Sequence, residues 1–210
     1  MHKLSNESEY RQALREKILE EATSCFNERG IRAVKMGDIA SCLSISKRTL
    51  YEIFRDKEEL VLETAKKRFC DKEKMMDAFM QTNPNVIEVV LEIYKHQVEE
   101  LSNTNPLMYS DLHKYTKVLD LISEHKRDNN KNALAFFNKG VEEGFFRNDI
   151  RYDILLELAD VQMNYIMSTK FYLKYPFIDI YKNLLLVTVR GFATEKGVKI
   201  LEEFFKKLDK

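Results

Sequence analysis

The fold of this chain follows from residues 36–57, which read MGDIASCLSISKRTLYEIFRDK. Within this stretch Ile39, Ala40 and Leu43 fall at i, i+1 and i+4, which places them in one apolar stripe on a short helix. The three residues after Leu43 read Ser-Ile-Ser and break this period, and the last of them, Ser46, is in position to cap a new helix. The pattern therefore predicts two short helices joined by a tight turn.

The second of these helices separates an apolar side from a basic one. Leu50 and Phe54 are four residues apart and share its inner face, and Ile45 supports the turn before it. Its outer N-terminal side carries Lys47, Arg48, Thr49 and Tyr51. An ordinary helical hairpin would need no cationic residues at one helix start. The pattern is typical of a helix-turn-helix, whose second helix enters the major groove of DNA with its N-terminus first.

A longer series of residues carries a family resemblance. The series comprises Ile18, Ala22, Phe26, Gly30, Asp38-Ile39-Ala40, Ile45-Ser46-Lys47, Leu50-Tyr51, Phe54 and Lys57-Glu58-Glu59-Leu60. Together these residues resemble the N-terminal domain of the tetracycline-repressor (TetR) family of bacterial transcription regulators, over about residues 12 to 62. The sequence departs from the family pattern at Lys35, where Thr or Ser is usual, and at Ile53, where His or Tyr is usual.

The resemblance implies a set of DNA contacts. Lys47, Arg48 and Thr49 would read base edges, and Arg48 could pair bidentately with guanine. Lys57, in the first turn of the following helix, would hold a phosphate, because an ammonium and free helix N–H groups can both face it there. The complete set of expected DNA-binding residues is Lys35, Ser46, Lys47, Arg48, Thr49, Tyr51 and Lys57.

Composition agrees with an all-α fold. The 210 residues include only three prolines and six glycines, and the net charge is zero, so any nucleic-acid surface must be local. The three cysteines are widely spaced without a CxxC, which favours small core residues of a reduced cytoplasmic protein over a disulfide or metal framework. The longest apolar run, residues 184–189, is too short to span a bilayer, and residues 1–9 do not resemble a signal peptide. We expect no metal, no cofactor and no membrane partner.

The order of helical patterns predicts two domains built from about nine or ten helices. Residues 1–9 read as a flexible tail, residues 10–62 as a three-helix DNA-binding head, and residues 63–210 as a larger helical domain for effector binding and dimerisation. A strut helix that begins after Asp56 joins the two domains. The later helices are expected to start at Asn83-Pro84 and Asn105-Pro106 and to cover about 118–143, 149–175, 178–192 and 195–208.

Two of the C-terminal helices are apolar around most of their surface. A helix of that kind must be covered on two sides, and a second copy of the chain is the simplest cover. In proteins that resemble this one, two C-terminal helices pair with their twofold mates in a four-helix bundle. The expected dimer interface comprises Asp160, Leu184, Thr188 and Gly191. A deep monomer core is the alternative, and Gly191 could equally end its helix.

The C-terminal domain is also expected to hold a pocket for a small-molecule effector. Its expected lining combines aromatic and methionine side chains with a histidine, since pockets are mostly apolar with a few polar groups. The candidates are Tyr94, Met108, Tyr109, His113, Phe136, Phe137, Met163 and Tyr165. Plain core packing is the alternative for each of them.

An enzyme and a protein-interaction adaptor are the competing classes. The sequence contains no Glu-x-x-His or His-Glu-x-x-His spacing, P-loop, GxGxxG or GxSxG, and Glu92 with His96 forms a lone i, i+4 pair. An adaptor would not explain the basic residues of the second helix. We therefore predict a ligand-responsive regulator and not an enzyme: a homodimer that binds palindromic double-stranded DNA and acts as a repressor released by an effector. An activator role and a regulator that binds no effector stay open.

Overall fold

The computed structural model describes residues 2–208, and the side chains of residues 8–129 and 132–206. Within that part of the chain there are ten α-helices and one short 3-10 helix, and no strand beyond an isolated bridge between Phe146 and Ala193. The all-α prediction is confirmed. None of these helices combines the length and the apolar character needed to cross a bilayer.

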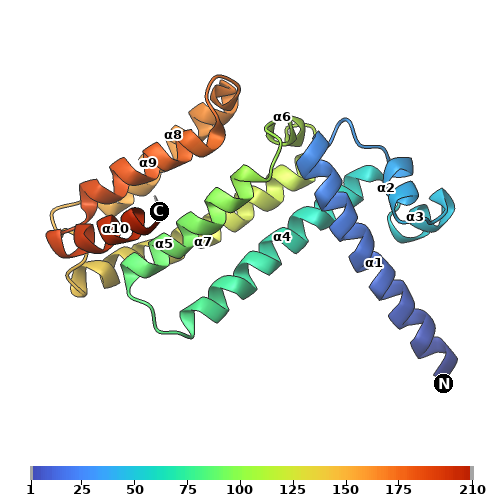
Figure 1. Ribbon diagram of the computed structural model, residues 1–210, viewed down its shortest axis with the longest axis horizontal. Helices are drawn as coiled ribbons and strands as arrows, with labels where there is room; N and C mark the ends of the chain where they lie inside the picture. The colour runs from blue at the N-terminus through green and yellow to red at the C-terminus, as the bar shows by residue number, and fades with distance from the viewer. Residues whose placement is uncertain (1, 209–210) are drawn as a thin grey trace. The chain divides into compact units, whose positions relative to one another are not determined.

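The chain divides into two compact units (Figure 1). The head unit comprises Met1–Lys74 and Asn103–Ile122, and the second unit comprises Met75–Ser102 and Ser123–Lys210. The sequence suggested a domain boundary at residue 62 and placed residues 103–122 in the second domain, whereas these residues belong to the head unit in this division. Backbone and side-chain bonds explain this placement: Asn105 N–H donates to Asn27 O at 2.6 Å, and Arg32 N–H donates to Asp111 Oδ2 at 2.7 Å.

The head unit is built around four helices and a small fifth one. They are α1 (His2–Arg29), α2 (Met36–Cys42), α3 (Lys47–Ile53), the first part of α4 (Lys57–Met80) and α6 (Leu107–Leu112), followed by the start of α7 (Thr116–Glu142). Their apolar faces form one core that includes Ile18, Ala22 and Phe26 from α1 and Leu50 from α3. Met108 of α6 and Val118 of α7 are buried in the same core, which fixes residues 103–122 to this unit.

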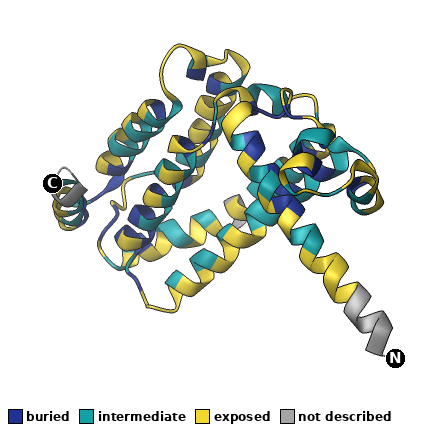
Figure 2. Ribbon diagram, turned by 45° about the vertical axis from the view of Figure 1, so that its right-hand side comes forward, coloured by how far each residue is buried: buried dark blue, intermediate teal, exposed yellow. Residues whose placement is uncertain are grey.

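Helix α1 begins at His2, whereas the sequence indicated a flexible tail over residues 1–9, and Met1 lies outside the described residues. No glycine or proline stands between His2 and Arg29, so nothing in the sequence stops the helix from extending toward the N-terminus. Among the described side chains of α1, those of residues 8–13 are exposed, and the buried ones lie from Ile18 onward (Figure 2). Burial therefore does not hold residues 8–13 in the helix.

The second unit contains α5 (Val86–Ser102), α8 (Tyr152–Ser168), α9 (Phe177–Phe192) and α10 (Glu195–Leu208), together with the ends of α4 and α7. Its core is rich in aromatic rings: Phe137 stacks on Tyr152 with ring centroids 4.5 Å apart, and Phe146 meets Phe192 edge to face at 4.9 Å. Such pairs contribute about 0.5–1.5 kcal/mol beyond their buried area.

The start of α10 agrees with the sequence, and two other helices differ from it. Helix α10 begins at Glu195, and Thr194 Oγ1 caps it by accepting from Gly197 N–H at 3.4 Å. Helix α5 is capped by Asn85, whose Oδ1 accepts from Ile87 N–H and Glu88 N–H at 3.0 Å, and not by Asn83. The helix expected over 149–175 covers only Tyr152–Ser168, because Lys170 adopts a left-handed conformation (φ +52°) before the 3-10 helix Phe171–Leu173.

Candidate nucleic-acid interface

The turn between α2 and α3 is a hydrogen-bonded C-cap with a left-handed residue. Ser44 has φ +53°, its N–H donates to Ser41 O at 3.1 Å, and Ile45 N–H donates to Ala40 O at 3.0 Å. This pair of bonds is the Schellman motif, in which glycine is the usual left-handed residue. Ile45 follows immediately and packs on the head core, as expected from the sequence. The turn therefore fixes the direction in which α3 leaves α2.

Ser46 caps α3 and is bound to Thr49. Its Oγ accepts from Thr49 N–H at 3.0 Å and lies 2.9 Å from Thr49 Oγ1. Leu50 and Phe54 are fully buried, which anchors the inner face of α3. The predicted cap is confirmed, and the hydroxyl groups of Ser46 and Thr49 are engaged with each other at the start of the helix.

The basic residues of this region are exposed around the starts of α2 and α3. Arg48 has 89% of its side chain accessible, and its Nε pairs with Glu52 Oε1 one turn later at 2.9 Å. Tyr51 is 50% exposed, and Lys35 and Lys47 are exposed as well. An exposed pair such as Arg48–Glu52 contributes only about 0.3–0.5 kcal/mol, so it is a small obstacle to a stronger partner.

Lys47 lies against the start of α2. A Cβ added to Gly37 would come within 2.5 Å of Lys47 Cε and 3.0 Å of Lys47 Nζ. The absence of a side chain at Gly37 therefore lets the lysine extend along α2 toward its first turn. The structure thus brings Lys47 from α3 close to the end of α2 at which Lys35 stands.

Lys57 has a different environment from the one expected. Its Nζ donates to the carbonyl oxygens of Ile31 and Val34, in the loop between α1 and α2. Burial lowers the pKa of Lys57, and the nearby carboxylates of Asp111 and Asp38 oppose that shift. The ammonium thus closes the loop on the start of α4, and at most one of its three N–H donors is left for a phosphate.

Sequence reasoning missed two arginines near the C-terminal end of α3. Arg11, an exposed residue of α1, donates from Nη2 to the backbone oxygen of Glu52 at 2.6 Å. Arg55 is exposed in the turn after α3 and pairs with Asp56 at 3.1 Å. No local pattern could have indicated Arg11, because its position depends on how α1 packs against α3.

The expected effector residues are divided between the two units. Met108, Tyr109 and His113 belong to the head unit, and the other five belong to the second unit. There Phe136 and Phe137 are partly buried against the aromatic core, whereas Met163 and Tyr165 are exposed on α8. A cavity of about 370 Å³ in the same unit is lined by none of the eight; its residues are Met80, Asn83, Pro84, Asn85, Lys139, Glu143, Phe145 and Lys196.

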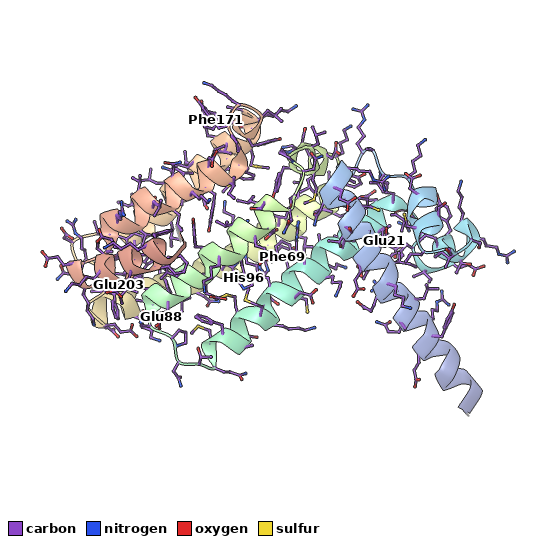
Figure 3. The ribbon with its side chains drawn as sticks, viewed as in Figure 1. Glu21, Phe69, Glu88, His96, Phe171 and Glu203 are labelled. Carbon is purple, nitrogen blue, oxygen red and sulfur yellow. The ribbon has the colours of Figure 1, made fainter. Side chains whose placement is uncertain are left out.

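Tyr94 lies in a second aromatic cluster. Its ring stacks on Tyr181 of α9 with centroids 6.2 Å apart and meets Phe205 of α10 edge to face at 5.3 Å. Burial raises the pKa of Tyr181 to about 12, and the neighbouring Tyr94 adds to the shift. On the same helix as Tyr94, His96 (labelled in Figure 3) has Nε2 3.3 Å from Glu92 Oε1, so the lone pair noted in the sequence is a partly exposed contact within α5.

One face of α8 is an exposed apolar stripe. Ile154, Leu158, Val161 and Tyr165 are spaced as i, i+4, i+7 and i+11, and all four are exposed. On α9, Val187 is 74% exposed, and a Cβ added to Gly191 one turn later would meet nothing within 4 Å. Of the expected interface residues, Leu184 and Thr188 are partly buried, and Asp160 pairs with Lys126 of its own chain at 2.9 Å.

Comparisons with known proteins point to one family. Residues 18–64 match the family model for bacterial regulatory proteins of the tetR family. The HTH-type transcriptional repressor KstR2 of Mycobacterium tuberculosis is 28% identical over 160 residues, which cover 67% of this chain and 73% of the repressor.

Two solved structures share the fold. The ketosteroid transcriptional regulator KstR2 of Mycobacterium tuberculosis is 22% identical with a TM-score of 0.55, over 86% of this chain and 95% of that one. A transcriptional regulator from Saccharomonospora viridis, solved in complex with choline, is 18% identical with a TM-score of 0.69, over 88% of this chain and 100% of that one.

Proposed function

Because the chain belongs to the tetR family of bacterial regulatory proteins and is a ligand-responsive, DNA-binding transcriptional regulator, we propose that it represses transcription as a homodimer on palindromic DNA. In this proposal α3 enters the major groove and Lys47 and Arg48 meet base edges. Lys35 and Tyr51 contact the flanking phosphates, and Ser46 and Thr49 hold the start of α3 while they approach the DNA. The observation that carries the proposal is the cluster of exposed basic side chains at the starts of α2 and α3.

The electrostatics of the head support this arrangement. The chain as a whole has no net charge, so attraction to DNA must come from this local cluster. Arg48 leaves Glu52 on binding, at a cost of about 0.3–0.5 kcal/mol, and gains a bidentate contact worth about 1–3 kcal/mol. The exchange favours the DNA-bound state.

A gel shift with DNA from upstream of the protein's own gene tests DNA binding. We expect the double variant Lys47→Ala/Arg48→Ala to lose at least about tenfold in affinity. Lys199→Ala removes an exposed lysine from α10 and should leave binding unchanged. An equal loss in both proteins would contradict the assignment of the site to α3.

The dimer proposal rests on the exposed stripe of α8 and on Val187 of α9. Two such faces related by a twofold axis would bury these residues in a four-helix bundle, and the open space over Gly191 would admit a partner helix. The two heads would then lie about 34–36 Å apart or more, one turn of DNA or a multiple of it. The interface expected from the sequence therefore widens to include Ile154, Leu158, Val161, Tyr165 and Val187.

Analytical ultracentrifugation tests the dimer. Leu158→Glu with Val187→Glu should give monomers, because paired carboxylates would face their twofold mates without water. Leu134→Glu changes an exposed leucine of α7 and should leave a dimer. A dimeric double variant with unchanged DNA binding would move the interface elsewhere.

We place the effector in the second unit, next to Tyr94. The stacked rings of Tyr94 and Tyr181 are largely covered and carry two phenol groups, so a small organic molecule with an apolar body would bind there by parting the two rings. Binding of the effector would tilt α4 and change the distance between the heads, with a coupling of about 1–3 kcal/mol. Tyr94→Ala should abolish release from DNA by such a ligand and leave DNA binding itself intact.

We propose that the protein has no catalytic activity and that it acts in the cytoplasm.

A further inference from the structure

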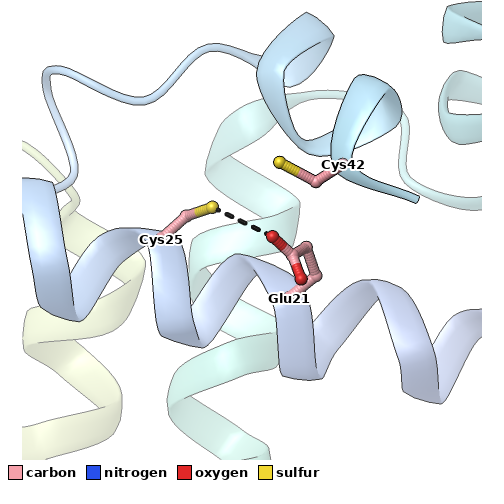
Figure 4. Close-up of side chains that lie close together, drawn as sticks. All are labelled: Glu21, Cys25 and Cys42. Atoms are coloured by element: carbon pink, nitrogen blue, oxygen red, sulfur yellow. Dashed lines mark hydrogen bonds between the residues drawn. The ribbon is translucent and has the colours of Figure 1, made fainter. Parts of the chain in front are cut away.

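Two cysteines and a glutamate meet where α1 packs on α2. Glu21 and Cys25 lie one turn apart on α1, and Cys42 is the last residue of α2. The two sulfur atoms and a carboxylate oxygen all lie within 4.8 Å of one another, and the Cys42 side chain points toward the pair on α1 (Figure 4). Cys25 is buried, Glu21 is half-buried and Cys42 is exposed, so the cluster opens to solvent on the Cys42 side.

In the present structure the thiol proton of Cys25 and the guanidinium of Arg29 both make hydrogen bonds within the cluster. Cys25 Sγ donates to Glu21 Oε1 at 3.4 Å, and Arg29 Nη2 donates to Cys25 Sγ at 3.1 Å. Arg29 is exposed in the last turn of α1, and the carboxylate of Asp38 also acts on it. The guanidinium can therefore turn away from the sulfur without leaving a buried charge behind.

The donor set fits a thiophilic divalent cation. Two thiolates and a carboxylate are established zinc ligands, and a fourth, tetrahedral position can hold water on the open side. With zinc–sulfur bonds of about 2.3 Å, two sulfurs of a tetrahedral site lie about 3.8 Å apart. The cluster therefore needs to close by about 1 Å at most, which rotation of the exposed Cys42 side chain can supply.

We propose that Glu21, Cys25 and Cys42 bind a soft divalent cation such as Zn²⁺, which joins α1 to the end of α2. On binding, each thiol releases one proton and Arg29 swings out, so two protons leave for each ion bound. The bridge lies directly before the turn that sets the direction of α3, and it stabilises the head. The uptake of the ion does not depend on the proposed DNA-binding function.

A disulfide between Cys25 and Cys42 is the competing chemistry. A disulfide would have to bring the two sulfur atoms to about 2 Å from each other, a larger movement than the approach to about 3.8 Å that a tetrahedral zinc site requires. Glu21 is also unexplained by a disulfide and is used by a metal site.

Titration of the reduced, full-length protein with Co²⁺, followed by competition with Zn²⁺, tests the proposal. We expect one ion per chain with the visible absorption of a tetrahedral thiolate site, and a higher melting temperature in its presence. Cys42→Ser should weaken binding at least about tenfold, and Arg29→Ala should strengthen it by removing a competing cation. Cys70→Ser changes an exposed cysteine of α4 outside the cluster and should bind like the unmodified protein.

Three results would overturn the proposal. They are no saturable uptake of Co²⁺ or Zn²⁺, an equal loss in Cys42→Ser and Cys70→Ser, or a Cys25–Cys42 disulfide on exposure to hydrogen peroxide in a protein that binds no metal when reduced. Because Cys42 is exposed, Cys42→Ser should fold normally, and a melting curve without metal verifies that it does.

Discussion

Replacement of Lys57 by methionine separates two roles for this residue. The resemblance to the tetR family implies a phosphate contact, whereas the structure has Nζ donating to the carbonyl oxygens of Ile31 and Val34. Methionine keeps the apolar stem of the side chain and removes the ammonium. We expect the loop between α1 and α2 to lose its tie to α4, and the head to become less stable.

The expected loss follows from the two hydrogen bonds. A hydrogen bond to a charged group contributes about 1.5–3 kcal/mol to the free energy of unfolding. Lys57 is only partly buried, so water can replace part of each bond, and we expect about 2–3 kcal/mol in the free energy of unfolding for the pair. For a unit of 60–100 residues each kcal/mol shifts the melting temperature by about 4–8 °C, so the head should melt roughly 10–20 °C lower.

Urea unfolding followed by circular dichroism measures this loss, with Lys17→Met as a control at an exposed position of α1. The control should stay within about 0.5 kcal/mol of the unmodified protein. Binding to random DNA then separates the two roles, because a lost phosphate contact would reduce the salt slope by about one unit per subunit. An unchanged unfolding free energy together with a reduced slope would refute the structural role.

Three further outcomes are expected. Ser44→Gly should raise the free energy of unfolding, measured with urea, by up to about 1 kcal/mol. The reason is that Ser44 is exposed and has a left-handed backbone, which strains a residue with a side chain. A loss of stability would contradict this strain. Because burial raises the pKa of Tyr181 to about 12 from an ordinary value near 10, the stability linked to its protonated form is complete below pH 10 and is lost as the pH rises toward 12. The loss amounts to about 3 kcal/mol in the free energy of unfolding. Unfolding curves at pH 9 and pH 12 should show this loss in the unmodified protein and not in Tyr181→Phe. Arg48→Ala should weaken operator binding by about 1–3 kcal/mol and relax preference at one base pair per half-site; an identical selected motif would exclude base reading.

The head could be predicted from the sequence because its signals are local. The cap at Ser46, the buried pair Leu50 and Phe54, and the packing of Ile45 each depend on neighbours within a few residues. Local propensity and hydrophobic period decide such features before tertiary contacts form. The family resemblance rests on the same short spacings.

Contacts between residues far apart along the chain could not be predicted from the sequence. Nothing local indicates that Asp111 accepts from Arg32, or that Lys57 reaches back to Ile31, since each pair is far apart along the chain. The same holds for the meeting of Cys25 with Cys42, which the wide spacing of the cysteines concealed.

The exposed stripe of α8 shows a further limit. The sequence indicates only that α8 and α9 are both rich in apolar residues. Which of their faces are left open depends on how the second unit packs, and that packing exposes Leu158 and Val187 while it covers most of Leu184.

Selection of DNA from a random-sequence pool by the full-length protein tests the central claim most directly. A dimer that presents one α3 from each subunit should enrich an inverted repeat whose half-sites lie one helical turn apart or a multiple of it. The same selection with Leu158→Glu/Val187→Glu should lose the repeat, because a single head contacts one half-site only. Recovery of no common motif by the unmodified protein, or of a single unrepeated site, would contradict the account of a dimeric DNA-binding regulator.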